Sequence, residues 1–122
     1  MNPKFEAGEN IAIKVPPHQF DKTVSFYKDI IKLEEINLTS PGDYDAAVFK
    51  FGDKNLWIDK MSATGHAEIW LEIKTDNAEK AAQYFDEYGV ARRDEIESLP
   101  VKFKGFWISS PSNIIHLVCE SE

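Results

Sequence analysis

Two short segments of the chain alternate between polar and apolar positions. Residues 10–15 read NIAIKV and residues 68–73 read EIWLEI, the period-two pattern of a β-strand with one face on a core. Each is followed by an aromatic-bearing stretch typical of a helix, at Phe26–Asp29 and Tyr84–Glu87. Position 68 follows position 10, and position 84 follows position 26, by the same 58 residues. Recurrence at one offset indicates a duplicated unit.

In the first copy, the strand ends at Pro16-Pro17, and an apolar stripe then predicts a helix over Gln19–Lys32. The stripe occupies positions i, i+4, i+7 and i+11, namely Phe20, Val24, Tyr27 and Ile31. Three further strands are expected at Glu35–Leu38, Ala47–Phe51 and Leu56–Met61, the last two joined by a hairpin over Gly52–Asn55.

In the second copy, a capping box marks the start of the helix, with Asp76 as N-cap and Glu79 three residues later. Gly89 supplies the C-terminal stop. The inward-facing stripe is expected to be Ala78, Ala81, Ala82 and Phe85. The remaining strands are expected at Arg92–Ile96, Gly105–Ser109 and Ile114–Cys119.

Both copies therefore follow the order strand, helix, strand, strand, strand. We expect one α+β domain over residues 1–122, with unit one at about 9–61 and unit two at about 67–120. Two such βαβββ units related by pseudo-twofold symmetry would form an open sheet that encloses a cleft, with both helices outside.

Alternation also assigns side chains to the two faces of this sheet. The best offset in the later strands is 57, which makes Asp59 equivalent to His116. All three tryptophans fall on the cleft wall, which suits a small-molecule pocket, although they could equally pack against a partner subunit or each other. The helix-facing set is Ile11, Ile13, Val15, Leu56, Ile58, Ile69, Leu71, Ile73, Ile115, Leu117 and Cys119. The cleft-facing set is Asn10, Ala12, Lys14, Trp57, Asp59, Glu68, Trp70, Glu72, Trp107, Ile114, His116 and Val118.

Charge and composition narrow the classes of function. The net charge of −7 argues against nucleic-acid binding through bulk electrostatics. No apolar run approaches membrane-spanning length, and the N-terminus has no signal-peptide core, so no membrane association is expected. The single cysteine, Cys119, excludes an internal disulfide and fits a reducing cytoplasm. We therefore expect a cytoplasmic protein whose partner is a small molecule.

Residues 26–33, FYKDIIKL, and the turn Ser110–Asn113 resemble motifs of the vicinal oxygen chelate superfamily. The first helix of that superfamily commonly reads FY-x-D-x-LG-L, and a late turn reads DPDGN. Lys32 stands here where the glycine is usual. The superfamily contains glyoxalase I, the extradiol dioxygenases, and the fosfomycin and bleomycin resistance proteins. The resemblance implies the paired-unit fold and a homodimer, and one scaffold of this kind hosts many chemistries.

Metal-dependent members of the superfamily bring one ligand each from the first and last strands of both units. The matching positions here are Asn10, Asp59, Glu68 and His116, where the family commonly has His or Gln, Glu, His and Glu. The resemblance thus implies a divalent-metal site, for which these oxygen donors favour Mn²⁺, Fe²⁺ or Mg²⁺. The alternative for Glu68 and His116 is an ion pair between neighbouring strands.

The cleft-facing residues and the resemblance together indicate two possible functions of different class. The first is a metal-free binding protein of the bleomycin resistance type, which holds a planar organic ligand. The second is a metal-dependent lyase or isomerase of the glyoxalase type, with Asp59, Glu68 and His116 as ligands and Glu68 or Glu72 moving a proton. The ligand contacts of the binding protein would be Trp57, Trp70, Trp107, Lys14, Ile114 and Val118.

Overall fold

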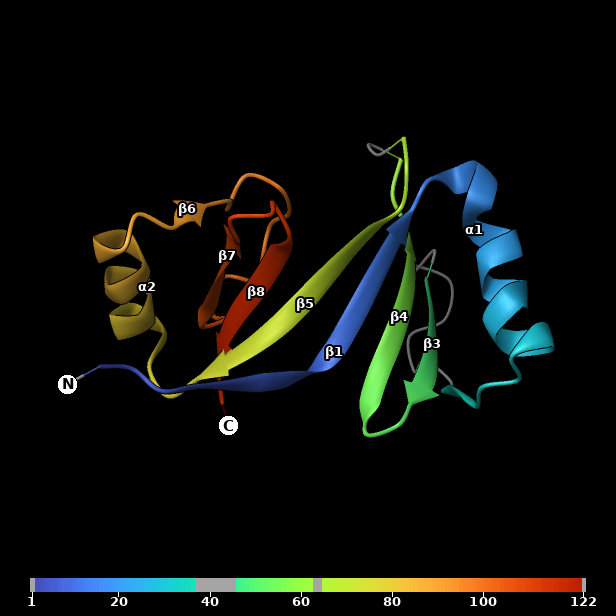
Figure 1. Ribbon diagram of the computed structural model, residues 1–122, viewed down its shortest axis with the longest axis horizontal. Helices are drawn as coiled ribbons and strands as arrows, with labels where there is room; N and C mark the ends of the chain where they lie inside the picture. The colour runs from blue at the N-terminus through green and yellow to red at the C-terminus, as the bar shows by residue number, and fades with distance from the viewer. Residues whose placement is uncertain (1, 37–45, 63–64, 122) are drawn as a thin grey trace. The chain divides into compact units, whose positions relative to one another are not determined.

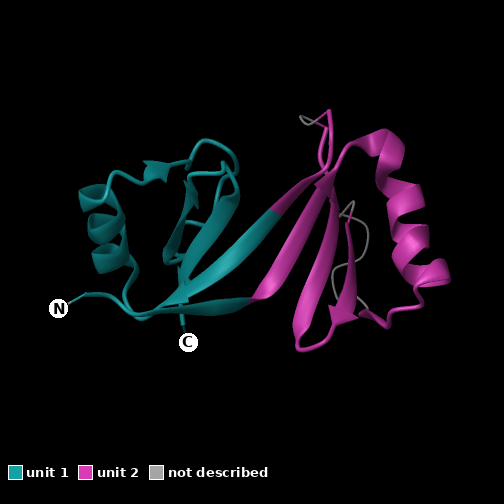
Figure 2. Ribbon diagram, in the orientation of Figure 1, with its two compact units in different colours: residues 1–8, 70–122 teal, residues 9–69 magenta. Residues whose placement is uncertain are grey.

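The computed structural model describes residues 2–36, 46–62 and 65–121 of the chain. It has the predicted α+β class, with a mixed sheet in the order β2-β3-β4-β1-β5-β8-β7-β6 and the helices α1 and α2 (Figure 1). The chain divides into two compact units, unit 1 with residues 1–8 and 70–122 and unit 2 with residues 9–69 (Figure 2). These numbers follow Figure 2 and reverse the order of the sequence, so unit 2 holds the first copy and unit 1 the second. Within the described ranges, no helix is long and apolar enough to span a membrane.

Unit 2 contains the first copy and has the predicted order of elements. Its first and last strands pair in parallel, and the other pairings are antiparallel. The hairpin is tighter than predicted, because only Gly52 and Asp53 form the turn, with Gly52 at φ 67°. Residues 37 and 38 of the expected second strand lie outside the described residues. The elements are β1 (Phe5–Val15), α1 (Pro17–Ser25), the π-helical turn η1 (Phe26–Ile30), β2 (Glu35–Ile36), β3 (Ala46–Phe51) and β4 (Lys54–Lys60).

The core of unit 2 lies between its helix and its sheet. The predicted helix-facing residues of β1 and β4 are found there, so their assignment is confirmed. The core consists of the buried residues Val15, Ala47, Phe49, Leu56 and Ile58, with Ile11, Ile13, Phe20, Val24, Tyr27 and Leu33 packed against them.

The end of the first helix differs from the prediction. Ile31, the last member of the predicted stripe, is 49% exposed, and Leu33 packs on the core. The cause is the wide turn η1, in which Ile31 N donates to Phe26 O at 2.9 Å. This i→i+5 bond inserts a residue and rotates the following side chain away from the core. Lys32 then adopts φ 64°, and Leu33 N donates to Tyr27 O at 3.0 Å.

Unit 1 contains the second copy together with the first residues of β1. Phe5 of β1 packs on Tyr84 and Phe85, at ring-centroid distances of 5.8 and 5.1 Å. The first and last strands of this copy also pair in parallel. Its second strand is shorter than the predicted Arg92–Ile96. The elements are β5 (Glu68–Thr75), α2 (Ala78–Glu87), β6 (Ala91–Arg92), β7 (Gly105–Ser109) and β8 (Ile115–Glu120).

The N-cap of α2 is one residue later than predicted. Asn77 is the cap, and its Oδ1 accepts a hydrogen bond from Lys80 N at 2.9 Å. Asp76, the predicted cap, instead accepts from Lys4 N at 3.0 Å. The Asp76 carboxylate, which the local sequence assigned to the helix cap, therefore binds the backbone of Lys4, just before β1. Gly89 ends the helix at φ 73°, as predicted.

The two faces of β8 are the reverse of those predicted. Val118, assigned to the cleft, is fully buried in the core beneath α2. His116 pairs with Leu71 and so also lies on the helix-facing side, whereas Cys119 pairs with Lys74 on the opposite face. Alternation places Ile115 and Leu117 on that opposite face too. The core beneath α2 consists of Ala78, Ala81, Phe106, Ile108 and Val118, with Ile73, Ala82, Phe85 and Val90 packed against it.

An error in the repeat offset explains this reversal. In unit 2, Met61 N donates to Val15 O at 2.8 Å. In unit 1 the equivalent bond runs from Ser121 N to Thr75 O at 2.9 Å, and both of its residues stand 60 positions later in the sequence. The structural offset of 60 differs from the predicted 57 by an odd number. Side chains alternate with period two, so an odd error moves every side chain of the strand to the other face. The residue equivalent to Asp59 is therefore Cys119, and not His116.

Replacing Lys32 with glycine should stabilise the protein, because a non-glycine residue at φ 64° is strained. We expect the free energy of unfolding to rise by about 0.5–1 kcal/mol, once the greater entropy of the unfolded glycine variant is subtracted. Lys22→Gly, in the right-handed helix α1, is the matched control and should lose about 1 kcal/mol. Urea unfolding measures both, and equal losses in the two variants would contradict strain at Lys32.

Candidate functional site

The face of the unit 2 sheet opposite α1 carries polar and aromatic side chains. Asn10 and Lys14 come from β1, and Asn55, Trp57 and Asp59 come from β4. The parallel register sets Lys14 beside Asp59 and Asn10 beside Asn55. Since the alternate residues of both strands form the apolar core, these side chains share the other face. We call these five residues the polar cluster.

An ion pair lies within the polar cluster. Lys14 Nζ donates to Asp59 Oδ2 at 2.8 Å, and only 9% of the Lys14 side chain and 22% of the Asp59 side chain are exposed. A buried ammonium without an anion beside it would lose its hydration with nothing to replace it. Asp59 therefore neutralises Lys14 in the folded chain.

A second pair of contacts in the polar cluster fixes an indole ring. Asn10 Oδ1 accepts from Trp57 Nε1 at 2.8 Å and from Asn55 Nδ2 at 3.2 Å, which uses both lone pairs of the amide oxygen. Trp57 remains only half-buried. Asn55 was missed in the sequence, although it stands two residues before Trp57 and alternation places it on the same face.

In unit 1, Trp70 and Trp107 pack on each other. Their ring centroids are 5.2 Å apart and their planes make 69°, an edge-to-face geometry, and each residue is only 5% exposed. Trp107 also donates its indole N–H to Glu97 O at 3.0 Å and its backbone N–H to Asp94 Oδ1 at 3.1 Å. Packing against each other was one of the alternatives left open by the sequence, and this pair adopts it.

The same face of unit 1 carries a carboxylate, a thiol and an ammonium. Cys119 Sγ lies 3.8 Å from Glu72 Oε2, and Lys74 is the register partner of Cys119. Burial raises the pKa of the Cys119 thiol, the negative charge of Glu72 also raises it, and Lys74 opposes the shift. A thiol kept protonated is a poor nucleophile, so Cys119 acts as a hydrogen-bond donor to Glu72.

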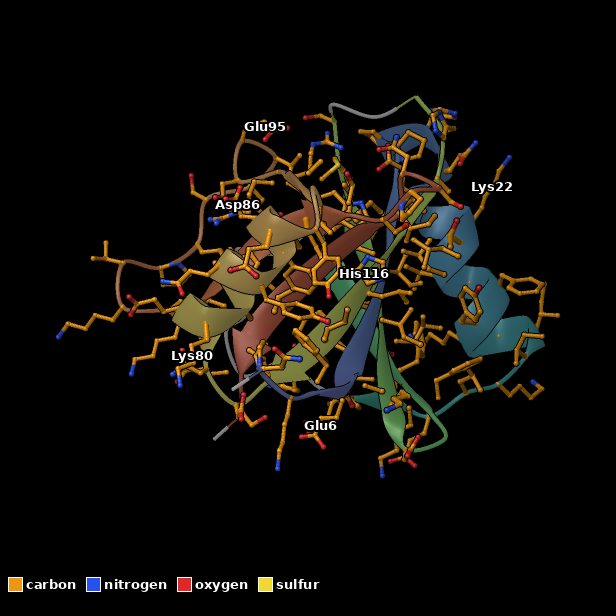
Figure 3. All side chains as sticks on the ribbon, turned by 60° about the vertical axis from the view of Figure 1, so that its left-hand side comes forward. Glu6, Lys22, Lys80, Asp86, Glu95 and His116 are labelled. Carbon is orange, nitrogen blue, oxygen red and sulfur yellow. The ribbon has the colours of Figure 1, made fainter. Side chains whose placement is uncertain are left out.

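His116 and Val118, which were also predicted for the site, lie on the opposite, helix-facing side of unit 1. His116 is half-buried on the helix-facing side of β8, with its Nδ1 3.0 Å from Ile114 O, and is labelled in Figure 3. Ile114 precedes the strand and is 37% exposed, and Val118 is buried in the core. Glu68 begins β5 and belongs to unit 2, whereas His116 belongs to unit 1. The predicted metal set is thus divided between the units.

The arrangement around Asp59 does not fit a metal ion. In the part of the chain that the structure describes, no three His, Cys, Asp or Glu side chains gather closely enough to hold one. Asp59 Oδ2 receives Lys14, and Asn10 Oδ1 receives two amide or indole donors. A divalent cation at Asp59 would also meet the Lys14 ammonium, and like charges repel. The two oxygen donors are therefore arranged for hydrogen bonding within the protein.

Comparisons with known proteins bear on the fold. No protein-family model matches the chain, and no curated protein matches it. A hypothetical protein from Bacillus halodurans has a similar structure, with 16% identity, a TM-score of 0.62, and a match over 98% of this chain and 96% of that one. A glyoxalase/bleomycin resistance protein/dioxygenase superfamily member from Vibrio splendidus has 13% identity and a TM-score of 0.60, over 91% and 97% of the two chains.

An Mn(II)-bound glyoxalase from Novosphingobium aromaticivorans is also similar, with 18% identity and a TM-score of 0.62. The match covers 97% of this chain and 40% of that one, so the chain spans less than half the length of that enzyme. The chain has the vicinal oxygen chelate fold, as the resemblance of its sequence implied. At these identities the likeness shows the fold and not the chemistry.

Asp59→Ala should destabilise the protein by about 3 kcal/mol, because it removes the carboxylate 2.8 Å from the buried Lys14 ammonium. Asp59 is partly exposed, so the loss should fall at the low end of the range for buried pairs. The matched control is the double variant Lys14→Met with Asp59→Leu, which removes both charges and should lose much less. Urea unfolding compares the two, and equal losses would show that the lost packing of Asp59, and not the lost ion pair, is responsible.

Proposed function

We propose that the chain is a small-molecule-binding protein of the glyoxalase and bleomycin resistance type, which holds a planar organic ligand against the polar cluster without a metal. The proposal depends on the contacts of Asn10 and Asp59, two of the three expected metal-ligand positions in unit 2. Asp59 is engaged by Lys14 and Asn10 by Trp57, each at 2.8 Å. Protein donors thus occupy one oxygen of Asp59 and the side-chain oxygen of Asn10, which weakens both residues as metal ligands.

The polar cluster suits a flat ligand with a hydrogen-bond donor at its edge. The Trp57 indole is already held by Asn10, so a ring that stacks on it does not have to restrict its motion on binding. Asp59 lies two residues further along β4, on the same face, with 22% of its side chain exposed. A flat aromatic wall beside a few fixed polar groups is the usual composition of a small-molecule site.

Ion pairing also makes metal binding costly at this position. A divalent cation at Asp59 would lie close to the Lys14 ammonium, which is 2.8 Å from Asp59 Oδ2 and whose side chain is 9% exposed. The two positive charges would repel each other, and the cation would weaken an ion pair that is largely buried. The ion pair therefore favours the metal-free function over the metal-dependent one.

The second candidate function is a metal-dependent lyase or isomerase. Its support is the structural likeness to the Mn(II)-bound glyoxalase, which motivates Mn²⁺, Fe²⁺ or Mg²⁺ as the ion. Asp59, Glu68 and His116 would be the ligands, with Asn10 completing the set, and Glu68 or Glu72 would move the proton. This function is the weaker of the two, because Asp59 and Asn10 are engaged by Lys14 and Trp57 and fit a metal ion poorly.

Trp57→Phe should weaken binding of a planar ligand by about threefold, because the phenyl ring offers a smaller stacking surface than the indole and loses the hydrogen bond to Asn10 that holds it. Suitable probes are planar heteroaromatic compounds that raise the melting temperature of the wild-type protein in a thermal-shift screen. The dependence of the melting temperature on probe concentration gives the affinity in each variant, and quenching of tryptophan emission in the wild-type protein reports contact with Trp57. Trp70→Phe is the control, because Trp70 is buried against Trp107 and should retain both affinity and quenching. Loss of affinity in Trp70→Phe but not in Trp57→Phe would place the ligand at Trp70 and Trp107 instead.

Addition of Mn²⁺, Fe²⁺ or Mg²⁺ should leave the melting temperature of the wild-type protein unchanged, since the candidate ligands are engaged within the protein. Elemental analysis of protein purified without chelators should find no stoichiometric metal. A metal-dependent rise in the wild type that disappears in Glu68→Ala would instead establish the metal-dependent function and its ligand. An equal rise in both proteins would indicate binding away from Glu68.

A further inference from the structure

Lys4 and the first residues of β1, Phe5–Gly8, contact other parts of unit 1, namely Asp76 before α2, the rings of α2 and Ser121 after β8. We call Lys4–Gly8 the N-terminal strap. Lys4 N donates to Asp76 Oδ1 at 3.0 Å, and Asp76 N donates to Lys4 O at 3.4 Å. Phe5 packs on the aromatic rings of α2. Ser121 Oγ, beyond β8, donates to Glu6 Oε1 at 3.4 Å.

The last residue of the strap lies against the side chain of Glu72. A Cβ atom on Gly8 would lie 2.5 Å from both Cγ and Oε1 of Glu72, and 2.7 Å from its Cβ. Rotation of the Glu72 side chain cannot relieve the last contact, because Cβ does not move with the side-chain torsions. Gly8 is not among the described glycines with positive φ, so its backbone conformation does not require glycine. The close approach to Glu72 does.

Glu72 is thereby confined between the strap and Cys119. Its Oε1 side faces Gly8, and its Oε2 lies 3.8 Å from the Cys119 thiol. We propose that the N-terminal strap is a positioning device, in which Gly8 sets the place of the Glu72 carboxylate against the Cys119 thiol on the face of unit 1 opposite α2. The strap therefore controls a carboxylate that the sequence nominated as a proton-transfer group. The inference concerns unit 1 alone, so it holds whether or not unit 2 binds a ligand or a metal.

The thiol itself reports the position of the carboxylate. Glu72 and Lys74 from β5 are the charged groups that act on Cys119, and its register partner on β7, Gly105, has no side chain. The next charged residues, Lys104 and Glu120, pair with each other at 3.9 Å, and Glu120 also accepts from the first backbone N–H of α2. A change in the Cys119 titration after substitution of Gly8 therefore reads the distance or orientation of Glu72.

The experiment is a pH titration of the ¹³Cβ signal of Cys119 by NMR, which needs no assignment because the chain has one cysteine. Glu72→Gln should lower the pKa of the Cys119 thiol, because it removes a negative charge that raises it. Gly8→Ala should lower it in the same direction by forcing strap and carboxylate apart. The double variant should titrate like Glu72→Gln alone, since Gly8 acts only through Glu72. Gly65→Ala, with no atom within 4 Å of the added methyl group, is the matched control and should titrate like the wild type.

A purely structural role for Gly8 would lower the melting temperature of Gly8→Ala and leave the Cys119 titration unchanged, and that result overturns the proposal. Additive effects of Gly8→Ala and Glu72→Gln in the double variant also overturn it. If Gly8→Ala does not fold, Phe5→Ala loosens the strap without adding an atom at Gly8 and should lower the Cys119 pKa in the same direction. A folded Phe5→Ala protein with the wild-type titration overturns the proposal equally.

Discussion

The parallel pairing of the first and last strands within each unit determines which side chains can interact on its polar face. In unit 2 the register places Lys14 beside Asp59, and in unit 1 it places Lys74 beside Cys119. A lysine therefore occupies the same position in both copies, and the residue across from it is a carboxylate in unit 2 and a thiol in unit 1. In unit 1 the carboxylate comes from Glu72, two residues before the lysine on the same strand. Each unit thus places one ammonium near one carboxylate by a different route.

This local charge balance shapes the chemistry that the scaffold supports. A carboxylate already beside an ammonium is a weak site for a divalent cation, because the ion must compete with a partner that is covalently tethered and largely buried. The same carboxylate can still accept a hydrogen bond from a neutral or weakly basic ligand. The vicinal oxygen chelate fold is therefore compatible with a metal-free site in this chain, and residue type at a few strand positions governs the difference.

The first strand serves both units. Its residues from Asn10 onward provide the parallel partner of β4, whereas its first residues pack on α2 and approach Glu72. A single continuous strand thus contributes Asn10 and Lys14 to one polar face and Gly8 to the other. Glycine at position 8 has a packing cause rather than a conformational one, and only the neighbouring side chain reveals it. Substitutions near the N-terminus are consequently expected to affect unit 1 more than their distance along the chain suggests.

Local patterns in the sequence were sufficient for the order of elements, the inward faces of β1 and β4, and the end of α2 at Gly89, since periodicity and backbone preference act over a few residues. They also placed Lys14, Trp57 and Asp59 on one face, although not the bonds between them. The prediction was wrong for the two faces of β8, because the register of β8 with β5 depends on a pairing between strands distant in sequence. It was also wrong for the burial of Ile31, because a single π-helical turn rotates the end of the helix. Burial of Trp70, and the capture of Asp76 by the N-terminal strap, were decided only by the tertiary structure, because each requires a partner that no local pattern specifies.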